Sequence, residues 1–353
     1  MSSIHNRIQA FVELGNFLSQ FSTIRIEKKE NVLHNELFFD GFKHQMKLAK
    51  ENNGWFTKNN MLFAIENWSK SLTKKILKEW ISKEDIVENN TKTIAVVMAG
   101  NIPLVGFHDF LSVLISGHKV LIKQSSNDRN LLPFLAKYLE YVDPYFKGNI
   151  IFTEDQLKDY DAVIATGSDN TARYFEYYFK NKPNIIRKNR NSVAIIQGNE
   201  TQEELENLGQ DIFRYFGLGC RNVSKLFVPK NYNFDQFFKG IYRQNHIINN
   251  LKYSNNYDYN KTVYLMSEFD ILENGFLMIK EDKSYASPIA TIFYEYYENQ
   301  DDLKNKIDKD SDKIQCIVAH NFSDNEVKFG QTQHPRLWDY ADGINTLMFL
   351  SKI

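Results

Sequence analysis

Residues 93–124 read TIAVVMAGNIPLVGFHDFLSVLISGHKVLIKQ and predict the architecture of the chain. A continuous apolar run, TIAVVMAG, ends at Gly100; the helix-like segment FHDFLSVLIS follows, and a second apolar run, KVLIKQ, begins after Gly117. Apolar runs of this length, bounded by glycines and separated by a helical segment, indicate a strand, a helix and a strand. Strands that read as continuous apolar runs are buried on both faces, so we expect them to pair in parallel.

The same alternation continues towards the C-terminus. Two helices and two strands are predicted in turn: a helix at NLLPFLAKYLEYV (130–142), strands at NIIFT (149–153) and YDAVIATG (160–167), and a helix at SDNTARYFEYYFK (168–180). Buried strands that alternate with helices predict an α/β fold with a doubly wound sheet of the Rossmann type. Ligands of such sheets bind beyond the carboxyl ends of the strands, so the loops after Met98, Ile122 and Ala165 are expected to carry function.

The regions on either side of this central part have different patterns of apolar residues. Residues 1 to about 88 are expected to be mainly helical, because NMLFAIENWSKSLTKKILKEWI (60–81) repeats apolar positions every three or four residues. Thr201 and Glu204 have capping-box spacing and open a predicted helix that ends near Gly217. Beyond it the sequence again mixes elements: strands at KTVYLM (261–266), IATIFYEYY (289–297) and KIQCIVAH (313–320), and helices at FDQFFKGIYRQN (234–245) and DDLKNKI (301–307). With 353 residues, the chain is long enough for a second α/β lobe.

Composition excludes several classes of function. With 43 basic and 44 acidic residues, the chain has no field of one sign that would attract nucleic acid or an anionic membrane. No apolar run of about eighteen residues occurs, so no membrane span is expected. Only Cys220 and Cys316 are present, which predicts a reducing, cytoplasmic compartment rather than a disulfide framework. No His, Cys and carboxylate cluster has the spacing of metal ligands, so no metal is expected, and His108, His334 and Asp342 are given no role.

The strongest single candidate for chemistry is Cys220 in the segment GLGCR. A cysteine attacks as the thiolate, which needs a local positive potential and access for substrate; Arg221 can supply the former. Flanking glycines let the backbone approach a bound carbonyl closely. Cys316 lies inside the apolar run KIQCIVAH and is expected to be an ordinary buried residue.

Three further signals follow predicted strands. Asn101, in GNIP, can direct its amide at an oxyanion. Lys123 and Ser125, after KVLIKQ, can donate to a ribose or a phosphate, and Gly167 with Ser168 offers a helix N-terminus to a pyrophosphate. Each signal is weak alone, because an Asn-x-Pro turn and a Ser at an N-cap are common. No G-x-G-x-x-G fingerprint follows the first strand.

Taken in order, these segments resemble the aldehyde dehydrogenase superfamily, whose dinucleotide site lacks that glycine fingerprint. The resemblance spans Thr93 to the C-terminus and is closest to the LuxC-like acyl-CoA reductases, bacterial enzymes that reduce fatty-acyl groups. It rests on AGNIPLVGFHDFLSVLISGHKVLIKQSSND, VIATGSDNTARYF, RKNRNSVAIIQG, YFGLGCRNVSKLFVP and RLWDYADGINTLMFL. It implies a helical segment and NAD(P)-binding domain over residues 1–200, a smaller catalytic α/β domain over 201–330, and a C-terminal segment, 331–353, that returns to the cofactor domain.

The resemblance also implies roles for the candidate residues. It matches them in this way: Cys220 to the acylated cysteine, Asn101 to the oxyanion-binding asparagine, Lys123 and Ser125 to the adenosine-ribose contacts, and Gly167 and Ser168 to the turn beside the pyrophosphate. The glutamate and phenylalanine of the superfamily's Glu-x-Phe-Gly-Pro motif are absent from DKSYASPIAT, so the nicotinamide-ribose contacts are unassigned.

Two departures from the superfamily sharpen the expected function. Hydrolytic members have a Glu-Leu-Gly-Gly-Lys segment whose glutamate activates water; RKNRNSVAII places Arg187 there, so an acyl-cysteine should persist until a thiol or a hydride reaches it. Many NAD-using members carry an acid three positions after the ribose lysine. Here Ser126 holds that position and Arg129 is nearby, which favours NADPH, with NADH possible.

The expected reaction is the NADPH-dependent reduction of an acyl-CoA, or of an acyl-protein thioester, to an aldehyde. The Cys220 thiolate attacks the thioester while Asn101 and the Cys220 backbone N–H hold the carbonyl oxygen, CoA leaves, and hydride reduces the acyl-enzyme. One alternative is a cysteine-dependent acyltransferase or thioesterase. Another is a non-catalytic subunit of an acyl-reductase complex, since the resemblance also implies an acyl-transfer protein as a partner.

Overall fold

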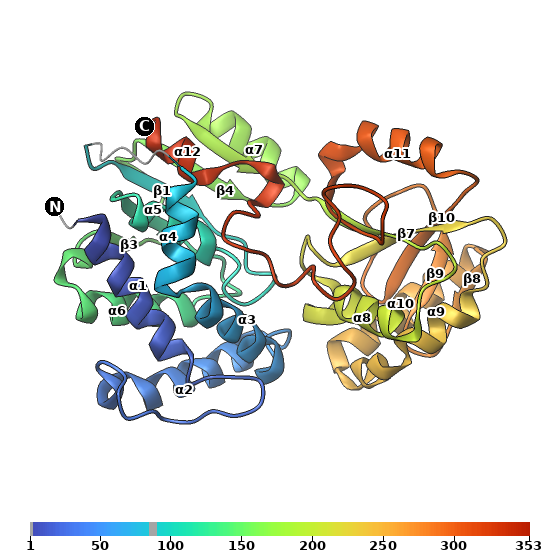
Figure 1. Cartoon of the computed structure of the whole chain (residues 1–353), viewed down its shortest axis with the longest axis horizontal. Coiled ribbons are helices and arrows are strands. Elements are labelled where there is room, and N and C mark those ends of the chain that lie inside the picture. Colours follow the sequence, from blue (N-terminus) through green and yellow to red (C-terminus); the bar gives the residue numbers. More distant parts are fainter. Residues whose placement is uncertain (1–2, 85–89) are drawn as a thin grey trace. The chain divides into compact units, whose positions relative to one another are not determined.

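The computed structural model describes residues 3–84 and 90–353 and divides into two compact units (Figure 1). Unit 1 comprises Met1–Lys188 and Arg336–Ile353, and unit 2 comprises Asn189–Pro335. The sequence-based boundary at residue 200 differs from this division because strand β6 (Asn191–Ile195) pairs with strands of unit 2. Residues 1–2 and 85–89, at the ends of the predicted N-terminal helical region, lie outside the described residues.

The sheet of unit 1 is fully parallel in the described residues. Its strands are β1 (Thr93–Val97), β2 (Lys119–Lys123), β3 (Ile150–Phe152), β4 (Ala162–Thr166) and β5 (Asn184–Arg187). They lie in the order β3-β2-β1-β4-β5, with every neighbouring pair parallel. The order reverses between β1 and β4, the position at which open α/β sheets bind their ligands. The predicted α/β fold with a Rossmann-type sheet is confirmed.

Helices cover this sheet because their apolar faces need burial. The helices of unit 1 are α1 (Ile4–Leu18), α2 (Asn35–Asn52), α3 (Lys58–Ser71), α4 (Lys74–Ser82), α5 (Phe107–Ile115), α6 (Leu131–Val142), α7 (Asp169–Phe179) and α12 (Thr346–Ser351), with short 3-10 turns η1 (Pro144–Phe146) and η5 (Ala341–Gly343). Fully buried aromatic rings such as Phe11, Phe17, Phe42 and Phe110 fill the core between them. Rings packed edge to face add about 0.5–1.5 kcal/mol per pair beyond the buried area.

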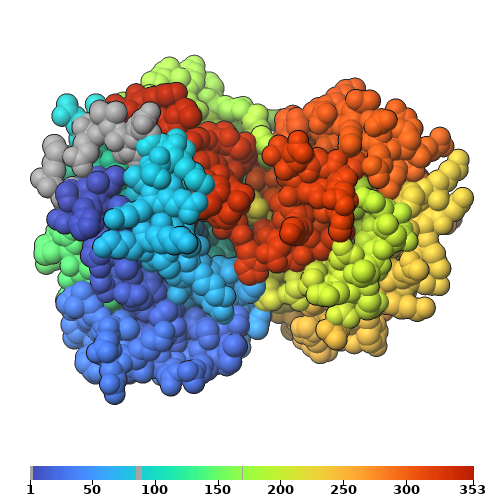
Figure 2. Space-filling view, in the orientation of Figure 1, coloured from blue at the N-terminus to red at the C-terminus, as the bar shows by residue number. Residues whose placement is uncertain are grey.

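The C-terminal segment, residues 336–353, completes the core of unit 1. Leu347 and Leu350 of α12 are fully buried. In the space-filling view the dark red end of the chain lies beside the cyan residues of α4 (Figure 2), where Trp80 Nε1 donates to the Tyr340 hydroxyl at 2.8 Å. The segment is therefore an integral part of unit 1, although unit 2 separates it from the rest of that unit in the sequence.

Unit 2 has its own sheet, in the order β11-β6-β7-β10-β9-β8 within the described residues. Besides β6, the strands are β7 (Val223–Pro229), β8 (Ile271–Glu273), β9 (Met278–Glu281), β10 (Thr291–Tyr297) and β11 (Ile314–Val318). The pairs are parallel except β8 with β9. Its helices are α8 (Gln202–Phe213), α9 (Phe234–Ile241), α10 (Leu251–Met266) and α11 (Gln300–Lys309), with 3-10 turns η2 (Arg214–Gly217), η3 (Tyr242–Asn249) and η4 (Ser311–Lys313).

One predicted strand is wrong. The segment KTVYLM forms the last turns of α10 instead of a strand. The helix begins at the N-cap Asn250, whose side chain accepts from the backbone N–H groups of Lys252 and Tyr253. Its buried residues, Tyr253, Tyr257 and Tyr264, recur at helical spacing and decide the outcome. Among the helices of the described residues, none combines the length and the apolar character needed to cross a bilayer.

Candidate active site

A pocket of about 890 Å³ opens at the carboxyl ends of the strands of unit 1. The loops after β1, β2 and β4, which the sequence analysis singled out, line it together with the loop after β3, which contributes Gln156, Leu157 and Tyr160. Its lining includes five of the candidate residues: Asn101, Lys123, Ser125, Gly167 and Ser168. The structure thus brings together residues that lie far apart in the sequence, from Asn101 to Ser168. Whether they bind a cofactor stays a prediction.

The loop after β1 carries Asn101, and a hydrogen bond to Asp128 fixes it. The Leu104 backbone N–H donates to Asp128 Oδ2 at 3.0 Å, and Leu104 itself has φ of 58°, a left-handed value that costs a non-glycine residue about 1–2 kcal/mol. Burial raises the pKa of the Asp128 carboxyl to about 7. A Cβ atom on Gly100 would lie 2.7 Å from the Ser125 side chain, so this glycine lets the loops after β1 and β2 approach each other.

Lys123 is the last residue of β2, and the loop that follows carries Arg129. Lys123 Nζ donates to the Asp155 backbone carbonyl at 3.0 Å. Arg129 does not line the large pocket; it lines a neighbouring one of about 230 Å³ together with Lys123 and Glu154. In that pocket Arg129 Nη1 lies 2.9 Å from Glu154 Oε1; the Arg129 side chain is half exposed and that of Glu154 is largely exposed. Glu154 was not identified from the sequence.

The loop after β4 presents the N-terminus of α7. Ser168 is its N-cap, and its side chain accepts from the Thr171 backbone N–H at 3.4 Å. A Cβ atom on Gly167 would lie 3.0 Å from both Phe175 and Thr171, so the glycine permits the close turn. The first N–H groups of a helix have no partner within the helix and, with the helix dipole, form a favourable site for an anion. This end of α7 therefore suits a phosphate group.

The large pocket also has an aromatic wall that the sequence analysis missed. Tyr160, Phe175, Tyr178 and Phe179 contribute to its lining. Three of them lie on α7, three and four residues apart, which places them on neighbouring turns. This spacing was visible in SDNTARYFEYYFK but is equally typical of an ordinary core helix.

Cys220 lies in unit 2, in an exposed loop between η2 and β7. Its backbone carbonyl accepts from Ser192 Oγ at 3.0 Å. The neighbouring Arg221 donates from Nε to the Thr332 carbonyl at 2.6 Å. Cys316 is buried on β11, as expected for a residue that fills the core. Of the two cysteines, Cys220 is thus the one that is exposed to solvent.

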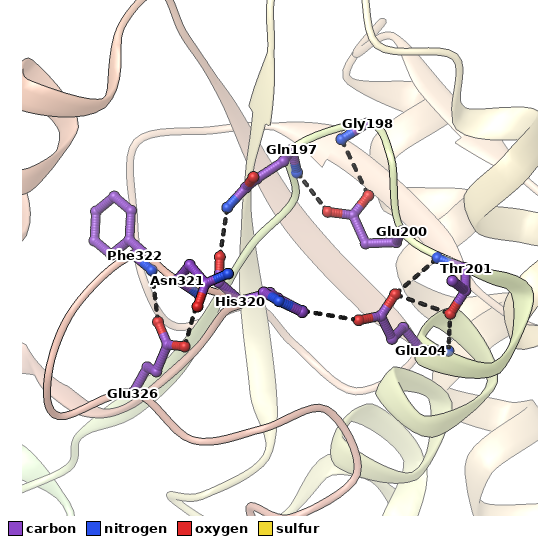
Figure 3. A network of polar contacts seen from close by, with 9 residues as sticks. All are labelled: Gln197, Gly198, Glu200, Thr201, Glu204, His320, Asn321, Phe322 and Glu326. Carbon is purple, nitrogen blue, oxygen red and sulfur yellow. Dashed lines mark hydrogen bonds and ion pairs between the residues drawn. The ribbon is translucent and has the colours of Figure 1, made fainter.

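Helix α8 leads into this loop and is fixed at its N-terminal end. Thr201 and Glu204 form the predicted capping box, and the backbone hydrogen bond from Thr201 is the main cause of the lowered pKa of Glu204. Figure 3 shows how Glu204 also contacts His320, whose backbone carbonyl accepts from Gln197 Nε2 at 2.6 Å. These contacts join the loops after β6 and β11 to the start of α8.

The C-terminal end of α8 is fixed by the buried carboxylate of Asp211. It accepts from the backbone N–H groups of Gly330 and Thr332 and from the Thr332 hydroxyl, at 2.6, 3.0 and 2.8 Å. Burial raises the pKa of Asp211 to about 6, against the lowering effect of these bonds. Because Arg221 also binds Thr332, the segment 330–332 supports both the helix end and the cysteine loop.

Arg187, which the resemblance aligns with the water-activating glutamate, is buried at the end of β5. It forms an ion pair with Asp109 of α5, and its Nη2 donates to Thr346 Oγ1 at 3.1 Å. A guanidinium has no acceptor and does not lose its proton in proteins, so it cannot act as a general base. Of the residues without an assigned role, His108 is partly buried, and its Nε2 lies 2.8 Å from the Leu337 carbonyl. Within the described residues, no three His, Cys, Asp or Glu side chains form a metal-binding group.

Comparison with solved structures defines the class of protein. The chain has the fold of the aldehyde dehydrogenases. It matches aldehyde dehydrogenase 21 of Physcomitrella patens with a TM-score of 0.65 and 10% identity, over 92% of this chain and 75% of that one. An NAD-dependent aldehyde dehydrogenase of Sinorhizobium meliloti gives 0.65 and 11% over 94% and 72%, and an aldehyde dehydrogenase of Bacillus cereus in complex with NAD+ gives 0.61 and 12% over 92% and 73%.

The family follows from the sequence. Residues 23–239 match the family described as Acyl-CoA reductase (LuxC), and the chain belongs to this family. No curated protein gives a significant sequence match. The resemblance predicted from the motifs is therefore confirmed.

Proposed function

We propose that the protein reduces an acyl thioester, acyl-CoA or acyl-protein, to an aldehyde through an acyl group on Cys220. Family and fold support an oxidoreductase that acts on acyl or aldehyde groups. The observation that carries the finer proposal is the exposed Cys220, held in a loop by the Ser192 hydroxyl, in a chain of this family. An exposed thiol in a fixed loop is accessible for attack, whereas a core cysteine is not.

The large pocket of unit 1 fits a nicotinamide dinucleotide. Its volume of about 890 Å³ is in the range of cofactor pockets. The N-terminus of α7 suits the pyrophosphate, Lys123 and Ser125 suit the adenosine ribose, and the aromatic wall suits a flat ring. When bound, such a cofactor supplies the hydride.

The residues of the chain have defined roles in this proposal. The Cys220 thiolate attacks the thioester carbonyl; a carbon–sulfur bond to Cys220 forms, and the CoA thiolate leaves. The Asn101 side-chain amide donates to the carbonyl oxygen as it gains negative charge. After reduction, the thiohemiacetal on Cys220 loses its hydroxyl proton, releases the aldehyde and returns the thiolate.

The arginine at position 187 explains why the product is proposed to be an aldehyde or a thioester, and not a free acid. Hydrolysis of an acyl-cysteine needs a base that removes a proton from water. Arg187 cannot remove it, and its guanidinium is engaged by Asp109 and Thr346. The acyl-enzyme therefore persists until hydride or a thiol arrives.

Arg129 supports NADPH as the preferred cofactor, with NADH as the second possibility. A guanidinium binds a 2′-phosphate well. In the structure Glu154 pairs with Arg129, so a 2′-phosphate has to compete with this carboxylate. Since exposed ion pairs contribute only about 0–1 kcal/mol, a phosphate dianion is expected to displace Glu154.

The first prediction is that Cys220→Ala abolishes turnover and leaves the affinity for NADPH unchanged within about twofold, because only chemistry depends on the thiol. NADPH oxidation is measured with acyl-CoAs of graded chain length, aldehyde is detected directly, and cofactor affinity is measured by fluorescence titration. Cys316→Ala, which removes the buried sulfur, is the matched control and keeps its activity.

Three outcomes would contradict the proposal. Reduction by Cys220→Ala near the wild-type rate would exclude the thiol. Free acid or an acyl-transfer product formed without NADPH oxidation would indicate a thioesterase or acyltransferase. Failure of Cys220 to become labelled by an acyl-CoA probe, alone and with an added acyl-transfer protein, would indicate a non-catalytic subunit.

A further inference from the structure

The side chain of Asn222, two residues after Cys220, is buried and surrounded by backbone groups. It is 2% exposed. Its Nδ2 donates to the carbonyls of Asp211, Ile212 and Arg214 at 3.0, 3.3 and 2.8 Å. Its Oδ1 accepts from the Gly219 N–H at 2.8 Å. An amide has two donor hydrogens and an acceptor oxygen, and every one of these is used here.

These bonds satisfy backbone carbonyls at the C-terminal end of helix α8. The last carbonyls of a helix have no partner within it, and leaving them unsatisfied when buried is costly. Many helices end with a glycine, and the backbone N–H groups of this glycine and of the next residue bind these carbonyls. Here the Asn222 side chain, eight or more residues further along the chain, takes over part of that function.

The segment between the helix and the cysteine is strained. Tyr215, Phe216 and Gly217 have φ values of 55°, 60° and 77°, and the left-handed region costs each non-glycine residue about 1–2 kcal/mol. Such a conformation persists only when its surroundings determine it. Asn222 supplies this constraint because it binds Arg214 before the strained residues and Gly219 after them.

Asn222 also fixes Gly219, the residue directly before Cys220. The Asn222 backbone N–H donates to the Gly219 carbonyl at 2.9 Å, while its side chain accepts from the Gly219 N–H. The carbonyl of Cys220 itself is held by Ser192. Gly219 and Cys220 are therefore fixed by hydrogen bonds on both sides of the Cys220 Cα atom.

We infer that Asn222 is a positioning residue, which couples the end of α8 to Gly219 and Cys220 and holds the Cys220 thiol in the orientation needed for attack. The inference rests on the proposed function for the role of Cys220. Asn222 does not touch the reacting atoms; it acts through the loop. A displacement of the nucleophile by about 1 Å is enough to reduce a rate about a hundredfold.

The test compares Asn222→Asp and Asn222→Ala in a Cys316→Ala background, so that Cys220 is the one thiol present. Asn222→Asp keeps the size and the acceptor but turns a carboxylate towards three carbonyls, and Asn222→Ala removes all four side-chain bonds. We expect acyl transfer to Cys220 from acyl-CoA, measured in single turnover, to slow by about 30–100-fold, with KM for NADPH unchanged within about threefold.

Asn35→Asp is the matched control. Asn35 is also buried, in unit 1, where its Nδ2 donates to Gln20 Oε1 at 2.8 Å and to the Lys29 carbonyl at 2.7 Å, and its Oδ1 accepts from Gln20 Nε2 at 3.0 Å. The same substitution there is expected to lower the melting temperature comparably and to leave acylation at the wild-type rate. A purely structural role of Asn222 would give the two aspartate variants the same kinetics.

Folded Asn222 variants that acylate at the wild-type rate would overturn the inference. If neither variant folds, Ser192→Ala carries the test: it removes one bond, to the Cys220 carbonyl, and is expected to slow acylation about 3–10-fold, the equivalent of about 1 kcal/mol. Wild-type acylation by Ser192→Ala would then overturn the inference. Failure of the proposed function has a different signature, because Cys220→Ala would retain activity or the parent protein would not be acylated.

Discussion

At the scale of single residues, we propose that the pair of Arg129 and Glu154 determines whether the adenosine end of NADPH or of NADH binds better. Both line the pocket next to Lys123, and their charges are opposite. Arg129 attracts a 2′-phosphate, whereas Glu154 repels it and can accept hydrogen bonds from the 2′-hydroxyl of NADH. The two side chains are therefore expected to have opposite effects on the two cofactors.

The prediction is that Arg129→Gln weakens NADPH binding about tenfold, the value of one charge-assisted bond, and changes NADH binding little. Glu154→Gln is expected to tighten NADPH binding about threefold and to weaken NADH binding. Dissociation constants are measured by fluorescence titration at fixed ionic strength. Glu140→Gln, in the Lys137–Glu140 pair away from both pockets, controls for a general charge effect. Parallel changes for both cofactors would exclude this reading.

Residues that follow strands were predictable one by one, but their partners were not. Asn101, Lys123 and Ser168 follow short apolar runs, so the sequence alone places them at one edge of the sheet. Glu154 lies in a polar turn and meets Arg129 across 25 residues. Asn222 shows no pattern at all, because its partners are backbone carbonyls, which every sequence contains.

At the scale of elements, the buried His118 and the partly buried His108 hold the C-terminal segment. His118 Nδ1 accepts from the Lys92 N–H at 3.2 Å, which leaves the proton on Nε2, 3.2 Å from the Leu350 carbonyl. His108 Nε2 lies 2.8 Å from the Leu337 carbonyl. Burial lowers the pKa of both imidazoles below the ordinary value. The neutral form of each is therefore the one that fits the folded state.

The pH dependence follows from these directions. A histidine whose pKa is lower in the folded than in the unfolded state contributes stability that is present above the unfolded pKa, about 6.5, and is lost as the pH falls below it. We expect the amides of residues 346–351 to open at least about tenfold more often at about pH 5.5 than at about pH 7.5, after correction for intrinsic exchange.

Hydrogen exchange read by mass spectrometry measures this opening. His118→Gln, which cannot titrate, is expected to weaken the pH dependence, and the amides of β7 in unit 2 serve as the internal control. Equal protection of the segment at both pH values would show that the histidines are not coupled to it.

Element types were predictable where the period was long enough to read. The strands β1, β2 and β4 are short apolar runs between glycines or polar turns, and the sequence analysis identified them. The strand predicted at KTVYLM was wrong because the window is only six residues long. Its β-branched and aromatic side chains are compatible with a strand and with the last turns of a helix. The tyrosines at 253 and 257, outside that window, carry the helical period of α10.

At the scale of the whole molecule, unit 2 is inserted between two parts of unit 1. The resemblance implied that residues 331–353 return to the cofactor domain; in the structure, Arg336–Ile353 belong to unit 1. The first boundary differed by about one strand, because β6 directly follows β5 with no linker of distinctive composition. The boundary between the two units depends on the sheet in which each strand pairs, and the local sequence does not determine this pairing.

Because residues 336–353 are part of unit 1, substitutions of buried and exposed residues of α12 are expected to differ in their effect on the free energy of unfolding. Leu350→Ala is expected to lower the free energy of unfolding by about 2–5 kcal/mol, because it opens a cavity in the core of unit 1. Met348→Ala, at a position 45% exposed, is expected to change it by less than about 0.5 kcal/mol. Exchange rates of both units are measured in each variant. Loss of protection in unit 2 for Leu350→Ala, with unit 1 unaffected, would contradict the assignment.

The same arrangement bears on synthesis by the ribosome. Residues 336–353 are translated after all of residues 189–335, so a nascent chain that has completed unit 2 still lacks Leu347 and Leu350. Until they emerge, the apolar core residues that pack against them stay exposed, and exposed apolar surface of this kind is what chaperones bind. Docking of residues 336–353 can thus begin only after unit 2 has been synthesised, and a ribosome that stops before residue 336 leaves unit 1 without Leu347 and Leu350.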